Sequence, residues 1–570
     1  MRSFLSTLVP DPDILFVTVP GTGSRQGLPG PGARNSNKQI NKVIKKIMST
    51  VTKLPNTLYL AKEVRELDRI AIKDFGIPGS VLMDRAGFAS FEAMRQHWPN
   101  ARHIRVLCGI GNNGGDGFVI ARYAKRAGLD VKVFPIGDVS RLSGDARGAF
   151  EAMSSAGLAP EAFEAHGLDD ADLVVDALFG TGLDRDITGP WSDAIQAINK
   201  ASGTTVAVDI PSGLHADTGR VLGCAVQADL TVTFIGLKQG MFTGQGNDLC
   251  GRLLFDSLGV PDEVYGRFAP SAYRIDYDAE KHHYLTPRAR SAHKGDFGHV
   301  LMVGGDAGFA GAVRMAGEAA ARVGAGLVSI ATRNAHATIV GTSCPELMCH
   351  GVETRADLDA LLARATVVAI GPGLGQSAWG ATMLDAVIQT GLPLVIDADG
   401  LNLLATLPRH GLNDRPGGHV LTPHPGEAAR LLDCTTAVIR DDRFKAVRDL
   451  AARFGGTAIL KGAGTLIFDE GGDLCVASDG NPGMATGGMG DILTGVIAGL
   501  TAQGIPISDA ARLGVCLHAR SADICAKAGE RGMLATDLIP GLRELANPEV
   551  APTTPRSSKQ QQNPMEIRGI

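Results

Sequence analysis

The segment GIGNNGGDG, residues 109–117, combines closely spaced glycines with side-chain amides and a carboxylate. Its glycines match the G-x-G-x-x-G dinucleotide fingerprint, between an apolar run and a helical pattern. A dehydrogenase would also need an acidic residue at the end of the second strand; here Pro135 follows that strand, and the nearest acid beyond it is Asp138. The amides of Asn112 and Asn113 suit a nicotinamide carboxamide, a ribose or a cation. The segment therefore indicates such a ligand, unless these side chains only cap the following helix.

Two aspartates close further apolar runs, and each is followed by a turn that contains glycine. Asp176 ends LVVD before ALFGTGL, and Asp209 ends VAVD before IPSGL. In open α/β sheets, ligands bind outside the carboxyl ends of the strands. A single aspartate in such a position is usually a helix or turn cap. Three polar segments at three strand ends predict one common crevice instead.

A third glycine-rich segment, GMATGGMGD, precedes the apolar helical stretch ILTGVIAGL. Gly487, Gly488 and Gly490 leave backbone N–H groups free at a helix start, which favours an anion such as phosphate. No G-x-x-x-x-G-K-[ST] motif occurs in the chain, so this is not a Walker-type loop. Asp491 is expected to stay ionised near neutral pH and could accept a proton from a hydroxyl that attacks a terminal phosphate. The alternative is that Asp491 caps the helix.

Strands and helices alternate in two series, which predicts an α/β protein with parallel sheets. The first series has the strand stretches HIRVLCGIG, DVKVFPIG, ADLVVDALFG, TTVAVDIPSG and CAVQADLTVTFIG, after a helical stretch that ends at Gly76 and Pro78. The second series includes HVLMVGGDAG, GLVSIAT, TVVAIGPGLG, LPLVIDADGLNLL, GHVLTPHPGEAARLL and TAILKGAGTLIFDEG. The patterning weakens near residue 260. We therefore expect one domain over residues 58–275, a second over 276–548, and disordered ends over 1–57 and 549–570.

The composition limits the classes of function. Lysine and arginine total 55 and aspartate and glutamate total 60, a net charge of −5, so no basic field favours nucleic acid. No apolar run approaches the roughly 20 residues that span a bilayer, so no membrane partner is expected. Nine cysteines without a C-x-x-C pair indicate reduced thiols in a cytoplasmic protein rather than disulfides or a zinc site.

GNNGGDG, VDALFGTGL and VDIPSGL, in this order at three strand ends, resemble the epimerase domain of the bifunctional NAD(P)H-hydrate repair enzymes. The resemblance covers about residues 58–275 and implies a Rossmann-like three-layer domain. Its substrate would be NADHX or NADPHX, in which C6 of the nicotinamide ring is hydrated. It also implies acid–base catalysis by Asp209 and a potassium ion held by Asn113, Asp176 and Ser212, whose oxygens suit a hard cation.

This chain departs from the family in the loop after Gly180, where other members can carry a lysine. The chain has Leu183, Asp184 and Arg185 there, so the resemblance assigns no second catalytic group. The substrate-binding residues that it implies for this domain are Asn112, Asn113, Gly114, Gly115, Asp116, Gly180, Thr181, Gly182, Leu183, Asp184, Arg185, Asp186 and Asp209.

The second series resembles the ADP/ATP-dependent NAD(P)HX dehydratase, which has a ribokinase-like α/β fold, over about residues 285–545. The resemblance rests on KGDFGHVLMVGGDAGFAGAVRMA, GPGLG, DADGLNLL, TPHPGE, LKGAGT and the final glycine-rich loop. It implies that the C6 hydroxyl is phosphorylated and phosphate then leaves, with Asp491 as the catalytic base. Mg²⁺ is expected because it bridges transferring phosphates. The implied nucleotide-binding residues are Lys461, Gly462, Ala463, Gly464, Thr465 and Gly490, and those of the hydrate pocket are Ala312, Gly373, Gly375, His424 and Asp491.

Taken together, the two resemblances imply a metabolite-repair enzyme. It would interconvert the R and S hydrates and dehydrate the S form at the expense of ADP or ATP, which restores NADH or NADPH. The alternative is a ribokinase-like small-molecule kinase fused to a non-catalytic nucleotide-binding or scaffold domain. A homo-oligomer is expected by analogy with related dehydratases. His424 has its own alternative, a loop histidine between Pro423 and Pro425.

Overall fold

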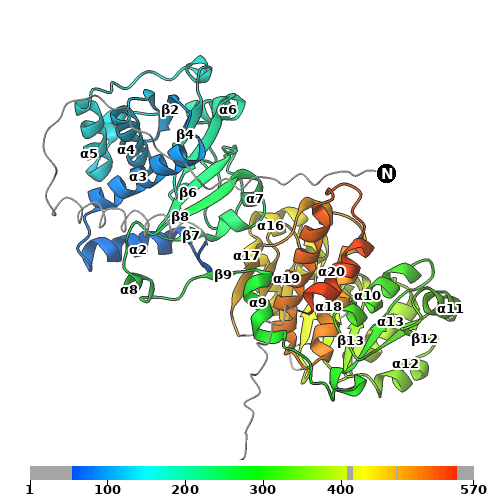
Figure 1. Cartoon of the computed structure of the whole chain (residues 1–570). Helices are drawn as coiled ribbons and strands as arrows, with labels where there is room; N and C mark the ends of the chain where they lie inside the picture. The colour runs from blue at the N-terminus through cyan, green and yellow to red at the C-terminus, as the bar shows by residue number, and fades with distance from the viewer. Residues whose placement is uncertain (1–53, 407–411, 413–414, 470, 548–570) are drawn as a thin grey trace, which may run out of the picture. The chain divides into compact units, whose positions relative to one another are not determined.

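The computed structural model describes residues 54–406, 412, 415–469 and 471–547 (Figure 1). Residues 1–53 and 549–570, which belong to the two expected disordered ends, lie outside these ranges, as does residue 548. Thr57 does not belong to such an end, because it starts strand β1 (Thr57–Tyr59). Within the described ranges, no helix has the length and apolar character that crossing a bilayer requires.

The first strand series forms a six-stranded sheet in which every neighbouring pair is parallel. The chain forms β2 first, adds β3 on one side of β2, and then crosses over to place β4 on the other side of β2. The carboxyl ends of β2 and β4 therefore flank a topological switch point, where open α/β sheets bind ligands. The order across the sheet is β3 (Asp130–Pro135), β2 (His103–Cys108), β4 (Leu173–Ala177), β5 (Thr204–Val208), β6 (Leu230–Phe234) and β8 (Arg252–Asp256).

Helices cover both faces of this sheet because alternate strand residues point to opposite sides. Val106 and Cys108 belong to one apolar core, while Leu107 belongs to the other. The predicted helix before β2 ends at Lys73, close to the expected breakers. The first core takes up α2 (Ala61–Lys73), α3 (Gly79–His97), α4 (Asn112–Arg126), α5 (Gly144–Ser155) and α8 (Asp262–Tyr265), and the second takes up α6 (Pro190–Lys200).

The second series forms a twelve-stranded sheet that also includes three short strands from residues before 276. The strands from β12 to β16 in this sheet are all parallel, and β17 runs antiparallel to both of its neighbours. The topological switch point of this second sheet lies between β10 and β13. The order is β12 (Met348–Gly351), β11 (Leu327–Thr332), β10 (His299–Val303), β13 (Val367–Ile370), β14 (Leu394–Ile396), β15 (His419–Leu421), β16 (Thr457–Leu460), β17 (Leu466–Phe468), β18 (Leu474–Ala477), β9 (Ala272–Ile275), β1 and β7 (Leu237–Lys238).

Two apolar cores lie on the faces of this sheet, so the second half is also a three-layer α/β arrangement. One core contains α10 (Ala310–Arg322), α11 (Asn334–Ser343), α18 (Met489–Ala502), α19 (Ile507–Ala526) and α20 (Leu538–Leu545), with α9 (Tyr277–Tyr284) at its edge. The other contains α12 (Arg355–Leu362), α13 (Ala378–Ile388), α14 (Ala398–Thr406), α15 (Pro425–Leu432), α16 (Thr436–Asp441) and α17 (Arg443–Phe454), while α7 (Gly246–Leu249) precedes β8.

Helix α18 is the most enclosed helix of the second half, because it packs between α10 and α19 (Figure 1). Glycines allow the close approach to α10: a Cβ built on Gly495 would lie 2.0 Å from the carbonyl oxygen of Ala316. An apolar helix buried on all sides is rigid. Its N-terminus, which carries the final glycine-rich loop, is therefore held at a fixed place.

Candidate active sites

The first candidate site is a cavity of about 790 Å³ at the carboxyl ends of β2, β4 and β5. The three polar segments predicted to meet do so here, since GNNGGDG, the loop after Asp176, and Asp209 all contribute to its wall. Of the expected substrate-binding residues, only Gly114 and Gly115 are not part of the lining. Those that line the cavity are Asn112, Asn113, Asp116, Gly180, Thr181, Gly182, Leu183, Asp184, Arg185, Asp186 and Asp209.

Asp176 and Ser212, two of the three expected potassium ligands, are in direct contact. The carboxyl group of Asp176 accepts hydrogen bonds from the Ser212 hydroxyl at 2.6 Å and the Ser212 backbone N–H at 2.8 Å. Both residues are completely buried. Burial raises the pKa of Asp176 to about 6, although the bonds from Ser212 oppose this.

Asn113, the third expected ligand, has a buried side-chain amide whose oxygen and nitrogen hydrogen-bond to no described residue. Its side chain faces the loop after β4, since a Cβ built on Gly180 would lie 3.5 Å from it. Buried amides in folded proteins nearly always have a partner. This orphaned amide oxygen therefore suits a ligand or ion in the cavity.

Helix α4 begins after Gly111, which is its N-cap, and no side chain caps it. The alternative reading, in which the Asn and Asp residues of GNNGGDG serve as caps, is therefore wrong. The carboxyl group of Asp116 forms no hydrogen bond or ion pair within the described residues, and it lines the cavity. Burial, together with the charges of Asp209 and Asp68, raises the pKa of Asp116 well above its ordinary value.

Asp209 follows β5 in a strained backbone conformation with φ 68°, which non-glycine residues rarely adopt. Its Oδ1 atom receives an ion pair from Lys238, a backbone N–H from Phe234 at 3.4 Å and a hydroxyl from Thr233 at 3.5 Å. Lys238 is completely buried, and its ammonium group also donates to Thr233 Oγ1 at 2.9 Å. Sequence reasoning missed Lys238, because FIGLKQG has no recognisable catalytic motif.

Asp68, on α2, is a second residue that sequence reasoning missed. It lines the same cavity, and its carboxyl group has no hydrogen bond or ion pair within the described residues. Burial, reinforced by the charge of Asp209, raises the pKa of Asp68 to about 6. The helical spacing gave no sign of this role, because Asp68 reads as an ordinary polar position of an amphipathic helix.

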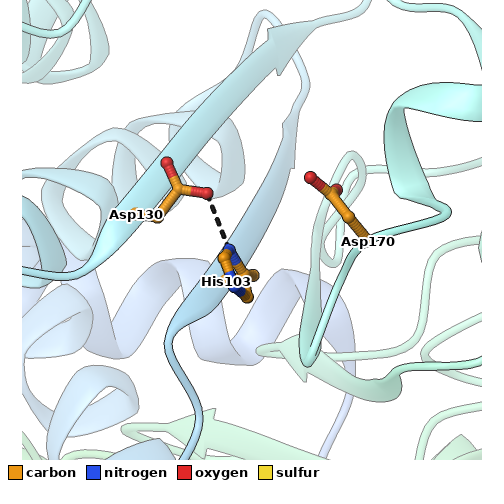
Figure 2. Close-up of side chains that lie close together, drawn as sticks. All are labelled: His103, Asp130 and Asp170. Carbon is orange, nitrogen blue, oxygen red and sulfur yellow. Dashed lines mark hydrogen bonds and ion pairs between the residues drawn. The ribbon is translucent and has the colours of Figure 1, made fainter.

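His103, Asp130 and Asp170 lie close together at the amino-terminal ends of β2, β3 and β4. Figure 2 shows the His103 ring directed at Asp130. The three residues have the spacing of a metal site. However, the guanidinium group of the fully buried Arg105 lies 2.8 Å from Asp130 and 2.7 Å from Asp170. Hydrogen bonds from Arg105 lower the pKa of Asp170. These carboxylates therefore neutralise a buried cation, at the strand ends where α/β sheets do not bind ligands.

The second candidate site centres on a buried ion pair at the carboxyl ends of β14 and β16. Lys461 Nζ lies 2.7 Å from Asp397 Oδ1 and 3.9 Å from Glu427 Oε2. Asp397 Oδ2 accepts a hydrogen bond at 2.9 Å from the hydroxyl of Thr494 in α18. Burial opposes ionisation of Asp397, but Lys461 holds its pKa below the ordinary value. Lys461 was predicted; Asp397 and Glu427 were not, although both lie in the quoted DADGLNLL and TPHPGE segments.

Asp491 lies in the first turn of α18, whose N-cap is Gly488 with φ 90°. No side chain caps this helix, so the capping alternative for Asp491 is wrong. Its carboxyl group has no hydrogen bond or ion pair within the described residues. Burial and the charge of Asp397 raise its pKa to about 7, so the expectation that it stays fully ionised near neutral pH is also wrong. Desolvation is the largest cause of this rise in pKa.

The expected pocket residues Ala312, Gly373 and Gly375 lie together beside the second switch point. A Cβ built on Gly373 would be 3.2 Å from the Ala312 methyl group, and the Gly375 N–H donates to Asp399 at 3.0 Å. His424 is the N-cap of α15: its Nδ1 atom accepts the Gly426 N–H at 2.9 Å. His424 thus has a structural role at this strand end, and its expected place in the hydrate pocket stays a prediction.

The expected nucleotide loop, residues 461–465, is anchored by a buried arginine that the sequence did not reveal. Arg443 donates to the carbonyl oxygen of Gly464 at 3.2 Å and to the hydroxyl of Thr243 at 2.9 Å. The Gly244 N–H donates to the carbonyl of Ala463 at 3.1 Å. The loop is therefore held partly by the short segment that follows β7.

Both sites can be compared with known proteins. A family model described as NAD(P)H-hydrate dehydratase matches residues 300–543. A second, described as YjeF-related protein N-terminus, matches residues 79–240. The chain is 48% identical over 492 residues to a bifunctional NAD(P)H-hydrate repair enzyme Nnr from Coxiella burnetii, which covers 86% of this chain and 99% of that protein.

The chain is similarly 45% identical over 499 residues to the protein of the same name from Escherichia coli, covering 87% of this chain and 95% of that protein. Among solved structures, ADP/ATP-dependent NAD(P)H-hydrate dehydratase from Bacillus subtilis, co-crystallised with ATP and Mg²⁺, is 28% identical with a TM-score of 0.42. It covers 48% of this chain and 97% of that chain.

Proposed function

This chain belongs to the family of bifunctional NAD(P)H-hydrate repair enzymes, and we propose that it restores hydrated NADH and NADPH through two successive reactions. The cavity beside β2, β4 and β5 interconverts the R and S forms of the hydrate. The site at the N-terminus of α18 then phosphorylates the C6 hydroxyl of the S form and eliminates phosphate. The observation that carries this proposal is the convergence of GNNGGDG, the loop after Asp176 and Asp209 on one cavity.

In the first reaction, Asp209 is the residue that exchanges a proton with the substrate. Its Oδ1 atom is held by Lys238, Thr233 and Phe234, whereas Oδ2 hydrogen-bonds to no described residue. The free oxygen is thus available to a hydroxyl group of the substrate. A general base must lie within hydrogen-bonding distance of the proton it removes, and a fixed carboxylate meets that condition.

Asn113, Asp176 and Ser212 would hold a potassium ion beside this base. The unpartnered amide oxygen of Asn113 is the observation that supports the fit, because it needs a partner of positive character. The carboxylate of Asp176 and the hydroxyl of Ser212 add oxygen ligands, which hard cations prefer. When bound, the ion would supply positive charge to the negative groups of the substrate.

In the second reaction, the free backbone N–H groups at the start of α18 receive the phosphates of ADP or ATP. Asp491 accepts the proton of the attacking C6 hydroxyl, and Lys461, paired with Asp397, adds a positive charge nearby. A Cβ built on Gly490 would lie only 3.1 Å from Lys461 Nζ, so the helix start and the lysine form one site. Mg²⁺ would be held mainly by the phosphates, since it usually takes one or two protein carboxylates. Asp491, whose carboxyl group has no hydrogen bond or ion pair among the described residues, is suited to that role as well as to proton transfer.

The test is to incubate the full chain with both hydrate epimers, in the presence of ADP, ATP or neither, and to follow the absorbance of the reduced nicotinamide. Full recovery of both epimers with a nucleotide, and interconversion without recovery when nucleotide is omitted, are expected. Phosphorylation of an unrelated small molecule without any effect on the hydrates would contradict the proposal. Light scattering of the same preparation checks the further expectation of a homo-oligomer.

A further inference from the structure

Inversion at C6 requires two groups with opposite tasks. The C6 carbon carries a hydroxyl group and is bonded to the ring nitrogen N1. It inverts if the C6–N1 bond opens to an aldehyde, the C5–C6 bond rotates and the ring closes again. Opening needs one group that removes the hydroxyl proton and another that gives a proton to N1, and closing needs the reverse. Asp209 accounts for the first of these groups only.

Lys238 makes Asp209 suitable as the base. Its ammonium group, fully enclosed by protein, pairs with Oδ1, and the same oxygen also accepts from Phe234 and Thr233. All the hydrogen bonds that described residues make to this carboxyl group therefore fall on one oxygen. This arrangement fixes the orientation of the carboxylate and leaves Oδ2 for the substrate.

Asp68 is the candidate for the second group. Its carboxyl group lines the same cavity from a different element, α2, and is without a hydrogen bond or ion pair among the described residues. The groups that face it are Asp116 on α4, Asp209 after β5, Lys238 on β7 and Tyr265 on α8. Burial and the charge of Asp209 raise the pKa of Asp68 to about 6, so a useful fraction carries a proton near neutral pH.

Asp116 is the rival, since it also lines the cavity and its carboxyl group has no hydrogen bond or ion pair in the described part of the chain. A group that gives and regains a proton in each turnover works best when its pKa is near the working pH. The pKa of Asp116 lies well above the ordinary value, because burial and two neighbouring aspartates oppose its ionisation. Asp116 belongs to GNNGGDG, the segment expected to bind the substrate, whereas Asp68 reaches the cavity from a different helix, α2. We therefore assign Asp116 a hydrogen bond to the substrate rather than the proton transfer.

We propose that Asp68 is the proton donor that complements Asp209 in the epimerase cavity, and that Lys238 positions Asp209. This inference rests on the proposed epimerase function. In the forward step, Asp209 Oδ2 takes the hydroxyl proton, the oxygen forms a C=O bond to C6, and the C6–N1 electron pair moves to N1. N1 takes the proton of Asp68. After rotation, N1 returns its proton to Asp68, attacks the aldehyde carbon, and the oxygen regains its proton from Asp209, so no atom or electron is lost.

The experiment uses the full chain without nucleotide, so that only interconversion occurs, and measures the two epimers by chromatography across pH. Asp68→Asn is expected to lower kcat by about a hundredfold or more, with a small change in KM, because acid catalysis typically contributes that factor. In the wild type, the rate should fall as the pH rises through about 6, where Asp68 loses its proton, and this fall should be absent in Asp68→Asn. Asp116→Asn should raise KM, and its rate should still fall as the pH rises through about 6.

Glu66→Gln is the matched control, because Glu66 lies on the same helix, pairs with Arg69 on the exposed surface and does not line the cavity. It should behave as the wild type. Dehydration of pure S hydrate with ADP reports whether Asp68→Asn is folded, and Asp68→Glu should recover part of the rate. Loss of the fall in Asp116→Asn, or near-normal turnover in Asp68→Asn, would overturn the assignment. If the wild type itself does not interconvert the epimers, it is the proposed function that fails.

Lys238 is tested separately as a positioning residue. Lys238→Met should lower kcat more than it raises KM, since the substrate still enters but the carboxylate is no longer oriented. Lys238→Arg should restore part of kcat, because a guanidinium group can also donate to Oδ1. Equal losses in both folded variants would indicate that Lys238 only fills the core and would overturn its positioning role.

Discussion

In the proposed second reaction Asp491 is the base, and its carboxyl group must be ionised to accept a proton. Since burial raises its pKa to about 7, kcat/KM for dehydration of the S hydrate should increase as the pH rises through about 7. Asp491→Asn should lower the turnover by about a hundredfold to ten-thousandfold, because the amide cannot accept the proton. The binding of ADP, measured by calorimetry, should change little. Near-normal turnover in the variant would rule out Asp491 as the base.

Lys461 also contributes to the stability of the fold, because its ammonium group compensates the buried charge of Asp397. Lys461→Met leaves that carboxylate unpaired and should lower the free energy of unfolding by about 3 to 5 kcal/mol, the usual cost of breaking a buried pair. Lys445→Met is the matched control. Its partner Asp449 is on the exposed face of α17, where water and salt screen the pair and it contributes little to stability. Urea unfolding followed by circular dichroism compares the two, and equal midpoints would contradict the prediction.

At the scale of elements, the contact between the nucleotide loop and the segment after β7 requires glycine. A Cβ built on Gly464, which has φ 60°, would lie 1.8 Å from the carbonyl oxygen of Phe242. Gly464→Ala should therefore displace the loop and weaken ADP binding at least tenfold. Gly472→Ala is the control, since Gly472 also has a positive φ, 87°, but its Cβ would meet no atom within 4 Å. The Gly472→Ala variant should therefore have backbone strain of about 1 kcal/mol but no steric clash, and it should bind ADP normally.

The elements and their loops explain which parts of the site could be predicted. The strands and the loops at their carboxyl ends follow from the patterns of apolar residues and glycines, so Asp209 and Asp176 could be identified. Lys461 was identified only through the family resemblance, and the order of the strands within each sheet was not predicted. Lys238 and Asp68 could not, because their roles depend on contacts across distant parts of the chain. The raised pKa of Asp491 could not be predicted either, since burial of a helix start is not visible in a motif.

The whole molecule should repair a mixture of epimers that the second site alone leaves partly unrepaired. The C6 hydroxyl must point at the terminal phosphate, and a misplacement of about 1 Å can cost a hundredfold in rate. The wild type with ADP should therefore convert a mixed hydrate pool in one phase. Asp209→Asn should show a fast phase that stops partway, followed by a slow tail set by spontaneous epimerisation. Addition of Asp491→Asn protein, which retains the first site, should remove the tail. A single fast phase in Asp209→Asn would show that Asp209 is not needed for epimerisation.

The segment after β7 touches both reactions. Lys238 pairs with Asp209, the proposed base of the first cavity, and Thr243 and Gly244, a few residues later, contact Arg443 and Ala463 at the proposed nucleotide loop. Thermodynamic linkage then sets a strict condition. If bound ADP changes the affinity of the first cavity for a hydrate by some factor, the hydrate must change the affinity of the loop for ADP by the same factor. If such coupling exists, the affinity for the hydrate depends on whether ADP is bound, and the affinity for ADP depends to the same extent on whether the hydrate is bound.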